Sequence, residues 1–211
     1  MFKRIGFVLI LSSLFISGLV FWHCFSGREA AFLWVNEHLS PSCGTAARVF
    51  SHVGETWGMV ILLGICLFQH WKKGLLIGLG WFTGACYSWI FKLWLMKGAE
   101  RPFAYFSKKN ISLQLVNGVE VHRFNTFPSG HTLTAFSILF LAVLVFPKMK
   151  WPSQFLLFTA AALCGLSRIV LVQHWQADVA GGAVLGILAA LSACRIVHFI
   201  PLDKSQSETL K

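Results

Sequence analysis

The chain has 211 residues, of which 56% are hydrophobic and only 12% are charged, and its mean hydropathy is +0.67. This composition excludes an ordinary soluble domain and is typical of an integral membrane protein. The formal net charge is +10, which suits an anionic partner. Nucleic acid is not the expected partner, because the sequence carries no nucleic-acid-binding motif.

Six apolar stretches predict six membrane-spanning helices, so the expected fold is all-α: a polytopic six-helix bundle. Most of the stretches approach the roughly 20 residues that a helix needs to cross a bilayer. They lie at about 5–24, 57–70, 75–96, 132–147, 153–172 and 179–200. We expect residues 1–211 to form a single integral membrane domain, with a polar cytoplasmic tail at 201–211.

The cations predict the orientation of the chain in the membrane. The basic start of the chain resembles a signal peptide, but no small-x-small cleavage site follows, so we expect an uncleaved first helix. Six spans place both termini on one side, and the lysines of the connections at 70–74 and 147–152 predict that this side is cytoplasmic. A second group of cations falls on the opposite, outer side and suits an anionic substrate: Arg28, Arg48, Lys97, Arg101, Lys108, Lys109, Arg123 and Arg168.

Two outer connections are long enough to carry structure of their own. Residues 29–38 predict a short amphipathic helix on the membrane surface, and residues 98–127 a cap or substrate-access loop. Four of the six cysteines lie in apolar helices, where cysteine packs as a small hydrophobe. Only Cys24 and Cys43 share the outer side, and a disulfide between them stays an open alternative.

The segment from Arg168 to Asp178 is the most informative part of the sequence. His174 and Asp178 are four residues apart, which on a helix places them on one face, so the carboxylate can orient the ring and leave one nitrogen as a nucleophile. Six positions separate Arg168 from His174, which predicts a helix end, a tight turn and a new helix that bring the three side chains together. The alternative is a snorkelling arginine and a helix-start acid; an acid in an otherwise acid-free span favours function.

A second motif, Pro128-Ser129-Gly130-His131, predicts a helix N-terminus. With Pro128 in the first turn, the amides of Ser129, Gly130 and His131 are among the unpaired donors that bind phosphate. His131 can give a proton to a leaving oxygen. An ordinary helix cap with an incidental histidine is the alternative.

A third motif, Arg101-Pro102, offers a bidentate donor on a stiff turn. Lys92 or Lys97 can supply a second cation beside Arg101. Lys92 lies in an apolar run, where an ammonium group is energetically costly, and this cost favours a functional role for it. A metal site made of His122, His131, His174 and Asp178 is the alternative interpretation. The nearby cations would repel a dication and stabilise a phosphoryl group, so we expect no metal and no cofactor.

Together the three motifs resemble the type 2 phosphatidic acid phosphatase (PAP2) superfamily in order, spacing and membrane context, over roughly residues 30–195. The resemblance implies a metal-independent mechanism in which His174 forms a phosphohistidine and Asp178 orients it. His131 would then protonate the leaving group and activate water. The phosphate oxygens would be held by Lys92, Arg101, Ser129, Gly130 and Arg168. One departure from the family is that Trp94 occupies the usual lysine position; we assign the role to Lys92, with a local bulge or a loop near Gly98, and Lys97 is the alternative.

The resemblance implies a phosphatase at the outer face of a bacterial inner membrane. Its substrate would be a lipid phosphate or diphosphate: lipid A, undecaprenyl diphosphate, phosphatidylglycerol phosphate or phosphatidic acid. Two alternatives stay open. One is a phosphotransferase that passes the same phosphohistidine to another acceptor. The other is an inert lipid-binding or transport protein on the same scaffold.

Overall fold

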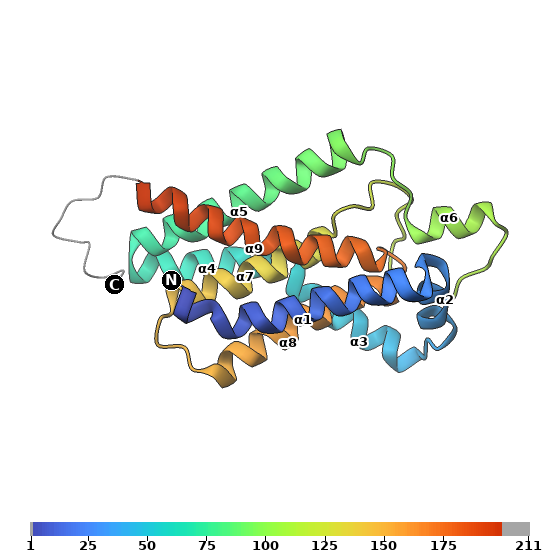
Figure 1. Ribbon diagram of the computed structural model, residues 1–211, viewed down its shortest axis with the longest axis horizontal. Helices are drawn as coiled ribbons and strands as arrows, with labels where there is room; N and C mark the ends of the chain where they lie inside the picture. Colours follow the sequence, from blue (N-terminus) through green and yellow to red (C-terminus); the bar gives the residue numbers. More distant parts are fainter. Residues whose placement is uncertain (1, 200–211) are drawn as a thin grey trace.

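The computed structural model describes residues 2–199, which form an elongated bundle of helices (Figure 1). These residues contain no β-strand, only an isolated bridge between Glu100 and Phe124. The predicted all-α class is therefore confirmed. The polar tail expected at 201–211 lies outside the described residues.

Six long helices coincide with the six apolar stretches. They are α1 (Phe2–Ser26), α4 (Thr56–Gln69), α5 (Trp71–Ile90), α7 (Gly130–Val145), α8 (Trp151–Val170) and α9 (Gln176–Phe199). Among residues 2–199, four helices are long and apolar enough to cross a membrane, namely α1, α5, α8 and α9. A fifth span is added if α4 and the segment before it, bent by 42°, count as one. Helix α7 is shorter, so the six-span count stays a prediction.

Shorter helices fill the connections. Helix α2 (Arg28–Glu37) confirms the helix expected at 29–38, whereas α3 (Pro41–Ser51), the 3-10 turn η1 (His52–Gly54) and α6 (Pro102–Lys108) were not predicted. Both α3 and α6 begin with a proline, whose fixed φ suits the first helical position. A π-helical turn, η2 (Phe91–Leu95), extends α5.

Helices α7 and α9 pack closely along the middle of the bundle. A Cβ on Gly186 would lie 2.5 Å from the carbonyl oxygen of Leu133, and one on Gly182 would lie 2.6 Å from that of Ser129. Small residues let helices approach in a membrane, where packing rather than water exclusion holds them together. This contact places the first turn of α9 beside the first turn of α7, and the Ser129 amide donates to the Asp178 carbonyl at 3.0 Å.

The two ends of the bundle differ. The start of α1, the α4–α5 turn, the α7–α8 connection and the end of α9 lie together at the left of Figure 1, while α2 and α6 cover the other end. There the guanidinium of Arg28 lies 4.5 Å from the ring centroids of both Tyr105 and Trp175, and Phe32 stacks on Phe106. These contacts attach α2 and α6 to the segment just before α9.

The segment between α6 and α7 is attached to α2 and α3. The Asn36 side chain donates to the Gln114 carbonyl at 2.8 Å and accepts from the Gln114 amide at 2.9 Å. Arg48 donates to the Asn117 carbonyl at 3.2 Å. The segment in which we expected a cap is thus attached to both α2 and α3 at this end of the bundle. The thiols of residues 24 and 43 are both free and exposed, so the disulfide left open is not formed in this structure.

Candidate active site

His174 lies in the turn that joins α8 to α9. Helix α8 ends in a Schellman motif, in which the Gln173 amide donates to the Arg168 carbonyl at 2.9 Å and the Val172 amide to the Ile169 carbonyl at 3.0 Å. Val172 adopts the left-handed conformation that this motif needs, with φ at 60°. The His174 amide also donates to the Arg168 carbonyl, at 3.1 Å. The structure therefore has the helix end, tight turn and new helix that the spacing predicted.

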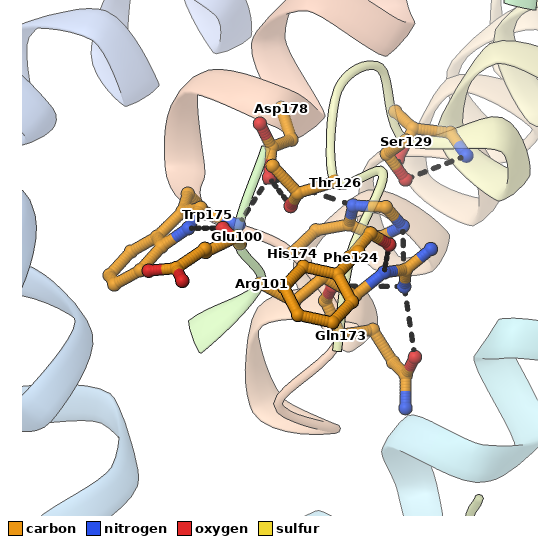
Figure 2. Close-up of polar contacts among 10 residues, drawn as sticks. Glu100, Arg101, Phe124, Thr126, Ser129, Gln173, His174, Trp175 and Asp178 are labelled. Carbon is orange, nitrogen blue, oxygen red and sulfur yellow. Dashed lines mark hydrogen bonds and ion pairs between the residues drawn. The ribbon is translucent and has the colours of Figure 1, made fainter. Parts of the chain in front are cut away.

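Asp178 lies in the first turn of α9, with its carboxylate close to His174 (Figure 2). His174 precedes the helix, so the expectation that the two share a helix face is wrong, and the turn brings them together instead. The distance from His174 Nδ1 to Asp178 Oδ2 is 3.6 Å. The same oxygen accepts from the Trp175 amide at 2.8 Å and from the Thr126 hydroxyl. Two neutral donors thus hold the carboxylate.

The His174 imidazole is 2% exposed. Burial lowers its pKa to about 4, and the nearby Asp178 carboxylate opposes this shift only in part. The ring is therefore neutral near pH 7 and keeps one nitrogen lone pair. Nδ1 has no hydrogen-bond partner within the described part of the chain, and the Asp178 carboxylate is close enough to orient an Nδ1–H. This arrangement leaves the ring's lone pair on Nε2.

Arg101 connects two loops around His174. Its Nε donates to the Phe124 carbonyl at 2.9 Å, and its Nη1 donates to the carbonyl and the side-chain oxygen of Gln173, each at 3.1 Å. Nη1 also lies 3.5 Å from His174 Nε2 (Figure 2). A guanidinium therefore lies beside the ring nitrogen that can act as a nucleophile. Its Nη2 group carries two more donors, which suit phosphate oxygens.

Ser129 is the N-cap of α7, and the helix itself begins at Gly130. Pro128 precedes the cap, so its predicted place in the first turn is wrong. The Ser129 amide is also not available to a ligand, because it donates to the Asp178 carbonyl. The first amides at the end of α7 are those of Gly130 and His131, and a helix N-terminus suits phosphate oxygens.

Two further cations approach this helix end. Arg168, only 8% exposed, donates through Nη1 to the Ser51 hydroxyl at 2.5 Å. The ammonium of Lys92 lies 3.6 Å from the place that a Cβ on Gly130 would take, and it interacts electrostatically with Arg101 and Arg168. The helix N-terminus therefore faces a cluster of positive charge.

His131 completes the cluster, since it interacts electrostatically with His174 and with all three cations. The structure thus brings together the eight residues that the sequence singled out: Lys92, Arg101, Ser129, Gly130, His131, Arg168, His174 and Asp178. Among residues 2–199, no three His, Cys, Asp or Glu side chains gather as a metal ion requires. His122, the remaining histidine of the alternative metal site, is exposed in the segment between α6 and α7.

Comparison with known proteins assigns the family. The sequence profile described as PAP2 superfamily matches residues 74–201, more than half of the chain. The chain belongs to the PAP2 superfamily. This membership classes it with hydrolases of phosphoric esters, and the matched range contains all eight residues of the cluster.

Two curated relatives match parts of the chain. Bacitracin transport permease protein BcrC of Bacillus licheniformis is 43% identical over 92 residues, which cover 43% of this chain and 40% of the relative. Lipid A 1-phosphatase of Porphyromonas gingivalis is 45% identical over 65 residues, which cover 30% of this chain and 14% of the relative. The chain therefore spans well under two thirds of either relative's length.

Two solved structures share the fold. LpxE of Aquifex aeolicus has a TM-score of 0.65 at 22% identity, over 78% of this chain and 92% of that one. The first transmembrane PAP2 type phosphatidylglycerolphosphate phosphatase from Bacillus subtilis has a TM-score of 0.64 at 22% identity, over 95% and 98%. Together with the candidate spans, this likeness shows the fold of a multi-pass membrane protein.

The PAP2 cluster includes Lys92 and not Lys97, which is exposed in the loop after α5. The unusual spacing between Lys92 and Arg101 is accommodated by two local features. The turn η2 is π-helical, with the Met96 amide donating to the Phe91 carbonyl at 2.8 Å, and Gly98 has a φ of 77°. A π-turn holds an extra residue, and a left-handed glycine reverses the chain. The bulge that the sequence suggested is therefore present.

Three residues in contact with the PAP2 site were missed from the sequence. Thr126 donates to Asp178, Gln173 accepts from Arg101, and Ser51 accepts from Arg168. Gln173 directly precedes His174, and Thr126 lies two residues before Pro128. A polar residue so close to a motif is a weak signal of a contact with the site. Ser51 comes from α3, which the sequence did not predict as a helix.

Proposed function

We propose that this PAP2 protein is a metal-independent lipid phosphatase that works through a phosphohistidine. The observation that carries the proposal is the placement of a neutral, buried His174 between the Asp178 carboxylate and the Arg101 guanidinium. A carboxylate on one ring nitrogen and a cation beside the other is the arrangement that a nucleophile for an anionic phosphoryl group needs.

The proposed reaction has two steps. His174 Nε2 attacks phosphorus, an N–P bond forms, the bond to the lipid oxygen breaks, and His131 gives its proton to that oxygen. Water then attacks the phosphorus of the phosphohistidine while His131 takes a proton from that water; the N–P bond breaks, its electron pair returns to His174 Nε2, and inorganic phosphate leaves. Lys92, Arg101 and Arg168 stabilise the charge on the phosphoryl oxygens, with the Gly130 amide at the helix N-terminus. Asp178 Oδ2 approaches Nδ1 more closely once the site is occupied, as catalytic hydrogen bonds often do.

The proposed substrate is a phosphorylated membrane lipid. The matched relatives and structures include a lipid A 1-phosphatase and a phosphatidylglycerolphosphate phosphatase. The position of the cluster near the ends of candidate spans, which end at Leu95 and Val170 and begin at Gln176, supports a lipid headgroup as its ligand. We further propose that both termini are cytoplasmic and that the site faces the outer side of the inner membrane, because the lysine-bearing connections lie at the end of the bundle opposite α2 and α6.

Phosphate release from the purified protein in detergent tests the proposal. The His174→Ala variant should lose activity by at least about a thousandfold, whereas His122→Ala, an exposed matched control, should keep it. Activity should persist in EDTA, and an acid-labile phosphoprotein should form in the wild type only. Full activity of His174→Ala would refute the assignment of His174 as the nucleophile. Strict dependence on an added metal would overturn the metal-independent mechanism. Mass spectrometry of lipids from cells with and without the protein would then identify the substrate.

A further inference from the structure

A cavity of about 420 Å³ lies beside the cluster, between α4, α5 and α7, which pack against one another (Figure 1). It extends from Gly130 and His131 at the start of α7 to Ser137, two turns further along the helix, and to Gly80 on α5. In the proposed function His131 protonates the leaving oxygen. The cavity therefore lies on the side of the site where the leaving group would be bound.

The walls of this cavity combine two chemistries. Apolar side chains and hydroxyl groups both line it, represented by Met59, Trp81 and Leu133 on the one hand and by Thr56, Ser88 and Thr134 on the other. A bare hydrocarbon chain would need no hydroxyls around it. The mixture fits the part of a lipid where a polar headgroup joins its chain.

Glu55 is the single acid among the residues that line this cavity. It precedes α4, and its carboxylate is hydrogen-bonded to His52 Nδ1 at 2.6 Å. It also interacts electrostatically with Arg168, one of the cations of the cluster. A carboxylate close to a phosphate site weakens the binding of further negative charge, yet it accepts hydrogen bonds from hydroxyl or ammonium groups.

We infer that the cavity receives the leaving group and that Glu55 selects lipid phosphomonoesters over lipid diphosphates; this rests on the proposed function. When His174 attacks the terminal phosphorus of a diphosphate, the bond that breaks releases a lipid monophosphate, and its negative charge lies in the cavity with Glu55. When His174 attacks a monoester, the leaving oxygen takes the proton of His131 and departs as a neutral alcohol. Hydroxyls on a glycerol or sugar leaving group then donate to the carboxylate.

The test compares kcat/KM for phosphatidic acid and for farnesyl diphosphate in the same detergent micelles. Glu55→Gln should raise the diphosphate-to-monoester ratio about tenfold, the order expected for one charge acting over ~10 Å at an effective dielectric of ~20. Glu55→Ser, which removes the charge and supplies a good helix cap, should do the same if the glutamine variant fails to fold. Glu55→Asp and the exposed Glu37→Gln on α2 should keep the wild-type ratio.

The outcomes separate this inference from the function on which it rests. An unchanged or lower ratio in folded Glu55→Gln or Glu55→Ser, with His174→Ala inactive on both substrates, would overturn the role of Glu55 alone. Undiminished hydrolysis of both substrates by His174→Ala would instead overturn the phosphohistidine mechanism. A higher ratio in Glu37→Gln as well would show a general charge effect and would also overturn the role of Glu55.

Discussion

Removal of the Thr126 hydroxyl tests whether Asp178 must be held in place for His174 to act. Thr126 is 5% exposed and donates to the carboxylate oxygen nearest the ring. Thr126→Val keeps the volume and loses this donor, while the Trp175 amide still holds the same oxygen at 2.8 Å. A hydrogen bond to a charged group contributes about 1.5–3 kcal/mol, so kcat should fall about 10- to 150-fold. KM should change little, because Thr126 does not touch the substrate in the proposed reaction.

Initial rates of phosphate release measure this effect. Thr126→Ser keeps the hydroxyl and should retain most of the activity. Thr159→Val is a matched control, because the Thr159 hydroxyl donates to the Phe155 carbonyl at 2.9 Å on α8, away from the cluster. A kcat for Thr126→Val within twofold of the wild type would refute the reasoning. Equal losses in Thr126→Val and Thr126→Ser would also refute it, since the defect would then follow packing rather than the hydrogen bond.

Two further predictions concern the cluster itself. Lys92→Ala should lower kcat/KM by about a hundredfold or more, because it removes a charge beside the α7 N-terminus, whereas Lys97→Ala should stay within twofold; equal losses would contradict the assignment of Lys92. The His174 ring should stay neutral as the pH is lowered to about 4, because burial outweighs the effect of Asp178 on its pKa. NMR of protein labelled in its histidine rings, assigned with His174→Ala, measures this, and titration near pH 6.5 would show that the ring is not desolvated.

Most of the helices could be predicted from the sequence because the membrane requires them. A segment in hydrocarbon must satisfy its own backbone groups, so an apolar stretch of the length of α1 or α9 is a helix whatever its neighbours are. Helices α3 and α6 were not predicted because they are short, with 11 and seven residues, and the main local signal for each is the proline at which it begins. The number of membrane spans could not be predicted from the sequence either, because α4 and α7 are shorter than a bilayer crossing and their burial depends on packing.

The chemical types in the cluster were predictable, whereas their contacts were not. Residues such as His131 and Arg168 stand in motifs whose spacing indicates chemistry, but Arg168 finds its partner Ser51 117 positions away in the chain. Thr126 lies 52 positions from Asp178. Such pairs arise from helix packing, for which a single sequence has no periodic signal. The shared helix face assigned to His174 and Asp178 failed for the same reason, because the Schellman turn and not helical spacing brings them together.

The charge arrangement of the cluster explains why Asp178 is held by neutral groups. If Asp178 formed a direct ion pair with Arg101, the guanidinium would neutralise much of the carboxylate charge, and less of that charge would act on His174. The Thr126 hydroxyl and the Trp175 amide fix the carboxylate without neutralising it, while Arg101 is fixed by carbonyl and amide oxygens. In the proposed reaction both charges are therefore available, the negative one to orient the imidazole and the positive one to bind a phosphoryl group. Opposite charges, those of Asp178 and Arg101, thus lie on the two sides of the buried His174 ring. The proposed attack of this ring on phosphorus needs that separation.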